Sequence, residues 1–207
     1  MKNNSQPLVS IIILNYNAGN LLLDCVESVL QTNYENYEII VVDNASTDNS
    51  QNECNEKFKP IQLIQNQKNL GYCEGNNVGI GNAGGEFVVI LNPDTLVESN
   101  WLNALVNGYQ EFGEGIYQPR FLTTDNHKIL QGTGNMIHLF GFGFARNKGD
   151  VDEGQFNKPE RIGYALIEDI TLKISQNVID KQYGTWMDIW SELSWLTSPS
   201  SLKNFRS

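Results

Sequence analysis

The 207-residue chain lacks the marks of several protein classes. No apolar run approaches the roughly 20 residues that a membrane span requires, and the polar N-terminus has no apolar stretch of a signal peptide. Three cysteines form neither a CxxC pair nor a disulfide framework, which favours a reducing compartment, and buried packing is expected for each rather than a catalytic thiol. We therefore expect no transmembrane segment and a cytoplasmic location, free or peripheral at the inner face of the membrane.

Basic residues and histidines are also scarce. Lys and Arg number 14 against 24 Asp and Glu, and a net charge of −10 argues against nucleic acid as a partner. One phosphorylated small molecule stays compatible with that charge, because a metal ion and helix amides can neutralise a phosphate. His127 and His138 have no acidic partner at ligand spacing, so a zinc site or a Ser-His-Asp relay is not expected.

Apolar runs and amphipathic segments alternate through the first half of the chain. Strands are predicted at residues 9–14, 37–42, 61–64 and 86–91, and helices at about 20–31, 50–58, 73–83 and 100–112. N-cap side chains are expected from Ser46–Asn49 and from Ser99. This alternation is typical of βαβ crossovers, so the predicted fold class is α/β, with a mainly parallel sheet covered by helices.

Polar residues follow three of the four predicted strands. They are the segments Asn15-Tyr16-Asn17, Asp43-Asn44 and Asn92-Pro93-Asp94. Ligands of parallel sheets bind beyond the carboxyl ends of the strands, so this coincidence is the strongest functional signal in the chain. Both GxxxxGK[ST] and a GxGxxG after the first strand are missing, which disfavours a P-loop or a dinucleotide site.

Each candidate residue also has a purely structural interpretation. Asp43 either accepts hydrogen bonds from the ribose or the base of a nucleotide, or simply starts a turn. Asp94 binds Mg²⁺ or Mn²⁺ together with substrate phosphates, or it belongs to a turn fixed by Pro93. For Gly75 and Gly79, close approach of a helix to the sheet is favoured over ligand contact.

Four motifs in order give these residues a family context. They are Val9–Asn17, Val41–Asp48, Asn69–Tyr72 followed by Gly75, Asn76, Asn77 and Gly79, and Leu91–Thr95. Together they resemble the family 2 glycosyltransferases of the GT-A fold, especially the rhamnosyltransferase-like branch of polysaccharide assembly. The resemblance implies a GT-A (Rossmann-like), mainly parallel sheet with helices on both faces. It covers residues 8–122, the expected nucleotide-sugar-binding core, and fades towards residue 160.

The resemblance implies transfer of a sugar from a nucleotide diphosphate sugar donor to a saccharide or lipid-linked saccharide acceptor, assisted by Mg²⁺ or Mn²⁺. Asn92 stands where the family's DxD motif has Asp, which leaves Asp94 as the metal ligand. The catalytic base is unassigned. The implied nucleotide-sugar-binding residues are Asn15, Tyr16, Asn17, Asp43, Asn69, Gly71, Asn76, Asn77 and Asp94.

The end of the chain differs in composition from the rest. Asn occurs 24 times in residues 1–160 and twice in 161–207, whereas three of the four Trp lie in that tail. Residues 123–160 are expected to form a loop-rich connection, with a mobile loop over Gly132–Gly149. The tail is either a divergent acceptor region or not the ancestral continuation, as after a frameshift or truncation, and the second interpretation is favoured.

Three functional hypotheses follow. The first is a metal-assisted glycosyltransferase, and the second is a donor-binding remnant that does not catalyse transfer. In the tail, Glu168, Asp169 and Asp188 are available acids, although a solvated helix face is the favoured interpretation for each. A sugar nucleotidyltransferase ranks last, because Asn15–Asn20 contains no Gly- and Arg-rich phosphate loop.

Overall fold

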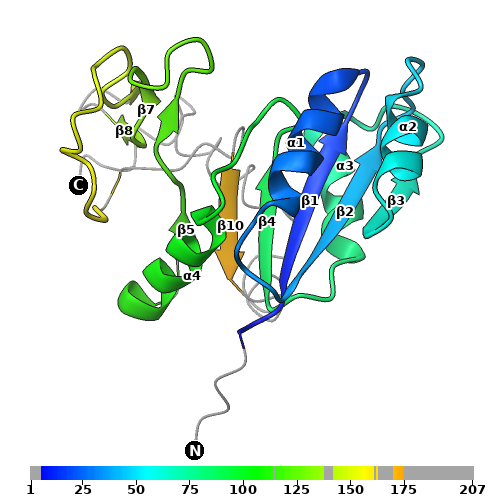
Figure 1. Cartoon of the computed structure of the whole chain (residues 1–207), viewed down its shortest axis with the longest axis horizontal. Helices are drawn as coiled ribbons and strands as arrows, with labels where there is room; N and C mark the ends of the chain where they lie inside the picture. Colours follow the sequence, from blue (N-terminus) through cyan, green and yellow to red (C-terminus); the bar gives the residue numbers. More distant parts are fainter. Residues whose placement is uncertain (1–5, 114, 138–141, 161, 163–169, 175–207) are drawn as a thin grey trace, which may run out of the picture.

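A six-stranded sheet forms the centre of the molecule (Figure 1). The computed structural model describes residues 6–113, 115–137, 142–160, 162 and 170–174. The strand order is β3-β2-β1-β4-β10-β5, in which β1 to β4 are parallel and β10 is antiparallel to both neighbours. The bounds are β1 Val9–Asn15, β2 Tyr37–Asp43, β3 Ile61–Gln65, β4 Phe87–Leu91, β5 Ile116–Tyr117 and β10 Ile170–Ile174. The prediction of a mainly parallel α/β sheet is confirmed.

Helices cover both faces of this sheet, as predicted. They are α1 Asn20–Leu30, α2 Ser50–Lys57, α3 Gly71–Gly81 and α4 Trp101–Phe112. Side chains of a strand alternate between faces, and every residue of β1 is buried. Ile11 and Ile13 pack in the core that includes residues of α1, α2 and α4, whereas Ile12 packs in the core on the α3 side. Continuous apolar strands therefore result from burial on two sides.

Two glycines let α3 lie directly on the sheet. A Cβ at Gly75 would lie 2.6 Å from Leu14 Cδ1, and one at Gly79 would lie 2.5 Å from Ile12 Cγ2. The structural interpretation of both glycines is therefore confirmed. The helix begins at Gly71, two residues before the predicted start, because Asn69 Oδ1 accepts a hydrogen bond from the Gly71 N–H and initiates the turn.

Neither predicted N-cap makes a side-chain capping hydrogen bond. The N-cap of α2 is Asn49, and its side chain does not cap the helix. Asp48, one residue earlier, instead accepts hydrogen bonds at Oδ1 from the backbone N–H and the hydroxyl of Ser50. The Ser99 cap is wrong, because α4 begins at Trp101 after Asn100 and no side chain caps it. The Ser99 carbonyl instead accepts a hydrogen bond from the Asn33 N–H, which commits this residue to a contact with a distant segment.

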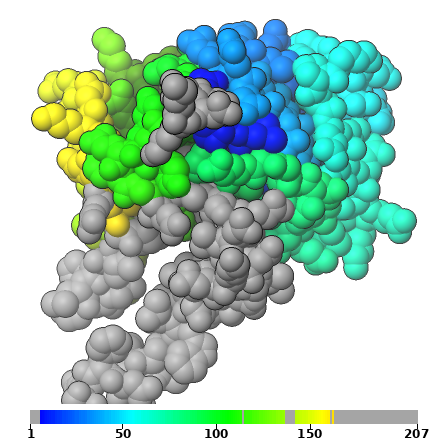
Figure 2. Space-filling model, turned by 90° about the horizontal axis from the view of Figure 1, so that it is seen from below, coloured from blue at the N-terminus to red at the C-terminus, as the bar shows by residue number. Residues whose placement is uncertain are grey.

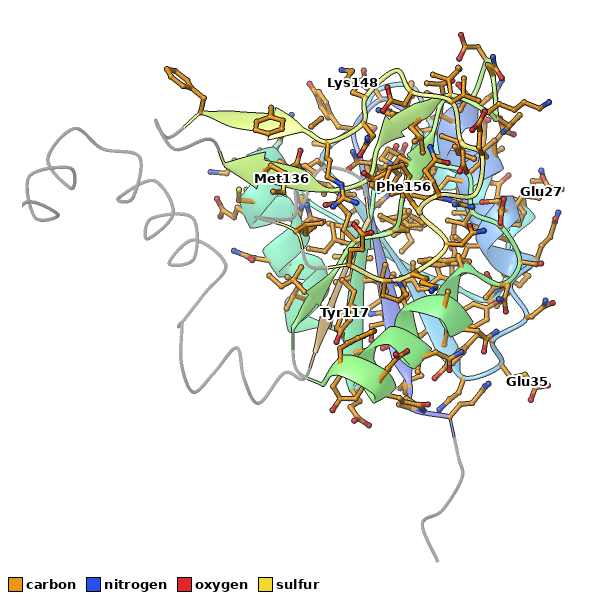
Figure 3. All side chains as sticks on the ribbon, turned by 90° about the vertical axis from the view of Figure 1, so that its left-hand side faces the viewer. Glu27, Glu35, Tyr117, Met136, Lys148 and Phe156 are labelled. Atoms are coloured by element: carbon orange, nitrogen blue, oxygen red, sulfur yellow. The ribbon has the colours of Figure 1, made fainter. Side chains whose placement is uncertain are left out.

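Short strands interrupt the loop-rich connection predicted for residues 123–160, most of whose described residues lie outside helices and strands. Strand β6 (Phe121–Leu122) pairs with β7 (Leu130–Gly132), and β8 (Asn135–Ile137) pairs with β9 (Gly143–Ala145), all antiparallel. Figure 3 shows Met136 on β8, which stands away from the main sheet, and Tyr117 beside α4. Arg146 anchors the second hairpin through hydrogen bonds to Thr133 and Glu160. The division of the chain at residues 123 and 161 stays a prediction.

Part of the predicted tail belongs to the main sheet. Strand β10 pairs with β4, with Ile170 opposite Leu91, and it also pairs with β5. The other tail residues singled out by the sequence, Glu168, Asp169, Asp188 and the three tryptophans, lie outside the described residues, as does His138. In the described part of the chain, no helix has the length and apolarity needed to cross a membrane.

A closed hydrogen-bond network lies at the amino ends of the strands. The Ser10 hydroxyl donates to Glu38 Oε1 and accepts from the Gly85 N–H, and the Gly84 N–H donates to the same Glu38 oxygen. Figure 2 views the molecule from below and shows the dark-blue start of the chain between green residues of the β4 region and lighter-blue residues that follow α1. The Phe87 N–H donates to the Leu8 carbonyl at this edge, which joins β4 to the chain that enters β1.

Candidate functional site

The loops that follow β1, β2 and β4 meet at the carboxyl edge of the sheet. Strand β1 lies between β2 and β4, and the chain order reverses there. Asn15 is opposite Asp43, and Ile13 is opposite Leu91. Ligands of open α/β sheets bind in the crevice at such a reversal point. The three polar strand ends found in the sequence therefore flank the expected place for a ligand.

Asn15 and Asp43 form a buried pair. Asn15 Nδ2 donates to Asp43 Oδ1 at 2.8 Å, and Asp43 Oδ2 accepts from the Ser46 N–H at 3.1 Å. Asn15 is fully buried and Asp43 is 2% exposed, so both carboxylate oxygens are used inside the protein. Asn15 Oδ1 has no hydrogen-bond partner among the described residues. The turn-forming role of Asp43 is thus present, and direct ligand contact stays a prediction.

Hydrogen bonds join the loop after β1 to the loop after β2. The Thr47 N–H donates to Asn17 Oδ1 at 2.7 Å, and the Gly19 N–H donates to Asp48 Oδ2 at 2.8 Å. Burial opposes ionisation of Asp48, but hydrogen bonds from Ser50 and Gly19 outweigh it and lower the pKa of the Asp48 carboxyl. The two loops therefore form one connected unit.

Backbone strain is concentrated in the same loops. Among the described residues, four that are not glycine have positive φ: Asn17, Ala45, Asn49 and Asn147. The first three lie in the loops after β1 and β2. Alanine has no side-chain hydrogen bond to compensate the left-handed conformation, so the φ of 62° at Ala45 is the most costly of the three. Such strain persists where surrounding contacts hold the backbone, and it often occurs at functional sites.

Asn44 connects the end of β2 to the loop before α3. Its Nδ2 donates to Asn69 Oδ1 and to the Gly71 carbonyl, and its Oδ1 accepts from Asn66 Nδ2 at 2.9 Å. Asn44 lies in one of the strand-end motifs of the sequence, but it is not among the predicted site residues. An amide immediately after Asp43 was the available signal. Asn69 and Gly71, both exposed, are held in place by this side chain.

The remaining predicted nucleotide residues differ in accessibility. Tyr16 is 53% exposed at the end of β1. Asn76 is buried, its Nδ2 donates to the Tyr72 carbonyl one turn earlier, and its Oδ1 has no partner among the described residues. Asn77 is half-buried on α3. Among the described residues, no side-chain hydrogen bond connects these three residues to the Asn15–Asp43 pair.

Asp94 is an exposed carboxylate in the loop after β4. It makes no hydrogen bond or ion pair with any residue that the structure describes, and neither does the side chain of Asn92. The described residues contain no cluster of three His, Cys, Asp or Glu side chains that would hold a metal by itself. One carboxylate with free oxygens fits Mg²⁺ or Mn²⁺, because these ions commonly take one or two carboxylates plus substrate phosphates.

Two of the three thiols are buried in the core beneath the site, as predicted. Burial, reinforced by the negative charge of Asp94, raises the pKa of Cys25 to about 12. Burial raises the pKa of Cys54 to about 11. Both groups are neutral thiols at physiological pH and are poor nucleophiles. Cys73 is half-buried on α3.

Comparisons with known proteins assign this chain to a family. The model of the glycosyl transferase family 2 matches residues 10–163, about three quarters of the chain, and spans every loop of the carboxyl edge. A second model, the major capsid protein N-terminus, matches residues 137–203. That match covers about a third of the chain and lies mostly outside the described residues, so it assigns no family.

Curated relatives agree with the match to the glycosyl transferase family 2. Glycosyltransferase GlyG of Streptococcus pneumoniae is 35% identical over 107 residues, 50% of this chain and 36% of its own length. Glycosyltransferase GlyA of the same organism is 31% identical over 166 residues, 77% of this chain and 23% of its own length. The chain thus spans about a third or less of these relatives.

Among solved structures, the mannosyltransferase PcManGT from Pyrobaculum calidifontis, in complex with GDP-Man and Mn²⁺, has a TM-score of 0.59. It is 16% identical, and the match covers 86% of this chain and 47% of that one. This likeness confirms the fold, the predicted α/β GT-A architecture. Because the family model covers well over half of the residues, the chain belongs to glycosyl transferase family 2.

Proposed function

We propose that the chain transfers a sugar from a nucleotide diphosphate sugar to an acceptor hydroxyl, assisted by a divalent cation. The observation that carries this proposal is the unpaired Asp94 carboxylate at the end of β4, next to the connected loops of β1 and β2. Family membership supports sugar transfer as the reaction. The proposal includes a role in polysaccharide assembly on the cytoplasmic side of the membrane.

The nucleoside is proposed to bind over the loops after β1 and β2. Asp43 is nearly fully enclosed, so it acts by holding Asn15 and Ser46 in place. The exposed ring of Tyr16 offers an apolar surface on which a base can stack. The exposed Asn69 and Gly71, fixed by Asn44, offer polar groups on the other side of the β2 end.

The diphosphate is proposed to reach the loop of Asp94. A divalent cation bound there would neutralise the negative charge that develops on the diphosphate leaving group. Asp94 supplies only one carboxylate, so phosphate oxygens have to complete the coordination, and the ion should bind tightly only together with a nucleotide. The mannosyltransferase PcManGT is in complex with GDP-Man and Mn²⁺ together, which supports this combination.

The acceptor is proposed to be a saccharide or a lipid-linked saccharide. Sugar transfer to its hydroxyl requires a base within hydrogen-bond reach of the proton that leaves. The described residues offer no carboxylate that we assign to this role. The tail acids Glu168, Asp169 and Asp188 are the remaining candidates of the sequence analysis, and substitution of each by Ala tests them.

Calorimetry with the Asp94→Ala variant tests the metal assignment. Nucleotide sugars are first screened by thermal shift with and without Mn²⁺, since a ligand that binds only the native state raises its stability. The Mn²⁺-dependent part of the affinity should then be lost in Asp94→Ala. The matched control is Asp125→Ala in the exposed turn between β6 and β7, which should bind like the parent chain. Unchanged Mn²⁺-dependent affinity in Asp94→Ala contradicts the assignment.

A donor-binding remnant without transfer is the second candidate. The observation in its favour is that we assign no carboxylate among the described residues as the base of the transfer step. Incubation of the purified chain with Mn²⁺ and a nucleotide sugar distinguishes the two functions. Release of nucleoside diphosphate, by transfer or by hydrolysis, supports the enzyme, whereas donor binding without any turnover supports the remnant.

A further inference from the structure

Helix α1 and the turn after it run alongside the loop that contains Asp94. Four hydrogen bonds join them: Cys25 Sγ to the Asn92 carbonyl at 3.5 Å, Val97 N–H to Ser28 Oγ at 3.2 Å, Asn33 N–H to the Ser99 carbonyl at 2.8 Å, and Trp101 Nε1 to Thr32 Oγ1 at 2.8 Å. The first two bonds lie on either side of Asp94. The loop is therefore positioned by a helix that is distant in sequence.

The hydroxyl of Ser28 has a defined direction. It donates to the Cys25 carbonyl of its own helix at 2.7 Å, so its lone pair is left to accept from the Val97 N–H. A backbone N–H can only donate, and this arrangement satisfies both groups. Val26 and Val29 on either side of this turn are fully buried in the core, which makes α1 a firm support.

The loop between these two bonds is short and closed. The Thr95 N–H donates to the Asn92 carbonyl at 3.2 Å, the same oxygen that accepts from Cys25. Asp94 and Leu96 between the bonded positions are exposed. With both ends of this loop bonded to α1, the backbone around Asp94 is held at the edge of the sheet, and its carboxylate makes no hydrogen bond or ion pair with the described residues.

We propose that Ser28, together with Cys25, is a positioning residue that orients Asp94 for a divalent ion bound with a nucleotide diphosphate. This inference rests on the proposed function. A carboxylate that is already oriented loses less conformational freedom when the ion binds, so its loop contacts contribute to metal affinity. Ser28 bonds to the backbone of the loop and not to the Asp94 side chain, so its effect on an ion would act only through Asp94.

Electron paramagnetic resonance of Mn²⁺ tests this role without measuring turnover. Mn²⁺ is titrated into the full chain with excess UDP or GDP, and loss of the free-ion signal is compared with a protein-free nucleotide reference. Ser28→Ala should weaken Mn²⁺ binding about threefold to tenfold, the size expected for one hydrogen bond. Ser28→Thr, which keeps the hydroxyl, should restore it. Binding of UMP or GMP in EDTA should not change.

Two further variants separate positioning from general damage. Thr32→Val removes the hydroxyl that accepts from Trp101 beyond the Asp94 loop, and it should leave Mn²⁺ affinity unchanged. In an Asp94→Asn background, Ser28→Ala should cause no additional loss. If Ser28→Ala does not fold, Cys25→Ala is measured instead and should weaken Mn²⁺ binding in the same direction.

Four results would overturn the inference. Unchanged Mn²⁺ affinity in Ser28→Ala, with a loss in Asp94→Asn, removes the role of Ser28 and leaves the proposed function standing. An additional loss in the Asp94→Asn background, or an equal loss of metal-free UMP or GMP binding, assigns Ser28 to general stability. Unchanged Mn²⁺ affinity in Asp94→Asn itself removes both the inference and the metal part of the proposed function.

Discussion

The two ends of the parallel strands use polar groups in opposite ways. At the amino end, the Ser10 hydroxyl donates to Glu38, the Gly85 N–H donates to Ser10, and the Gly84 N–H donates to Glu38. At the carboxyl end, Asn15 Oδ1 and the Asp94 carboxylate have no partner among the described residues, and three residues have left-handed backbone.

This difference separates stability from function. A buried polar network that is complete contributes to a unique fold, whereas strained backbone and free ligand groups reduce stability and are kept where a ligand uses them. We therefore expect substitutions at the amino end to change stability alone. Substitutions at the carboxyl end should change stability less and ligand binding more.

Gly85→Ala should have the largest effect on stability. A Cβ there would lie 2.7 Å from the Ser10 backbone nitrogen and 2.8 Å from the Phe87 carbonyl oxygen, and neither atom can move without the sheet. We expect a loss of about 3 kcal/mol in the free energy of unfolding, measured by urea denaturation. The matched control is Gly81→Ala on α3, where a Cβ meets no atom within 4 Å and no loss is expected. Equal stability of the two variants would contradict the prediction.

Asp43→Ala should reduce both the stability of the chain and its affinity for nucleotide. It removes the acceptor of the Ser46 N–H and one acceptor of Asn15 Nδ2, which keeps Ser46 Oγ and Ser50 Oγ. We expect a loss of about 2 kcal/mol in unfolding free energy and about tenfold in nucleotide affinity. Asp43→Asn, which keeps the shape and one acceptor oxygen, should lose less of both. Calorimetry of nucleotide binding and urea denaturation measure the two effects. A variant that does not fold at all would assign Asp43 to the turn alone.

Ala45→Gly should stabilise the chain. Glycine adopts a φ of 62° without the steric cost that alanine has. Because glycine is also more flexible in the unfolded chain, which offsets part of this benefit, we expect a net gain of about 0.5 kcal/mol in the free energy of unfolding. The same substitution at the exposed Ala104 within α4 should instead lose about 1 kcal/mol. In thermal unfolding, a stability gain for Ala45→Gly with a loss for Ala104→Gly supports strain at the carboxyl end. Stability changes of the same sign in both variants argue against it.

Removal of the Asp48 charge should have the smallest effect. Its pKa is lowered in the folded chain, so the ionised carboxylate stabilises the loops at neutral pH, and that contribution is lost as the pH falls through the lowered pKa. Asp48→Asn should therefore flatten the acid side of a plot of melting temperature against pH, whereas Asp125→Asn in the exposed β6–β7 turn should not. Identical curves for both variants would exclude this role.

The sequence predicts the fold where burial alone determines it. Strands β1, β2 and β4 are continuous apolar runs because both faces are covered, and their predicted bounds agree with the structure to within one residue. The hairpins of residues 121–145 were missed, because strands of two or three residues have no recognisable period. Strand β10 was missed because its partner β4 lies far away in the sequence.

The candidate site was predicted as positions rather than as contacts. The strand-end pattern selects Asn15, Asp43 and Asp94 because polar residues there interrupt the apolar run. It does not identify Asn44 as the residue that holds Asn69, or Ser28 as the residue that holds Val97. Those roles depend on pairs that are 25 and 69 residues apart, which side-chain periodicity within one element does not encode.

Strand β10 determines the order in which the sheet can be completed during synthesis. Among the described strands, β5 pairs only with β10, and the edge of β4 that faces away from β1 pairs with residues 170–174, which are made later. At 5–20 residues per second, the roughly 80 residues between β4 and β10 correspond to a delay of roughly 4–16 s. For that interval a nascent chain presents the apolar edge Phe87–Leu91 to its surroundings, the kind of strand edge that pairs with other chains.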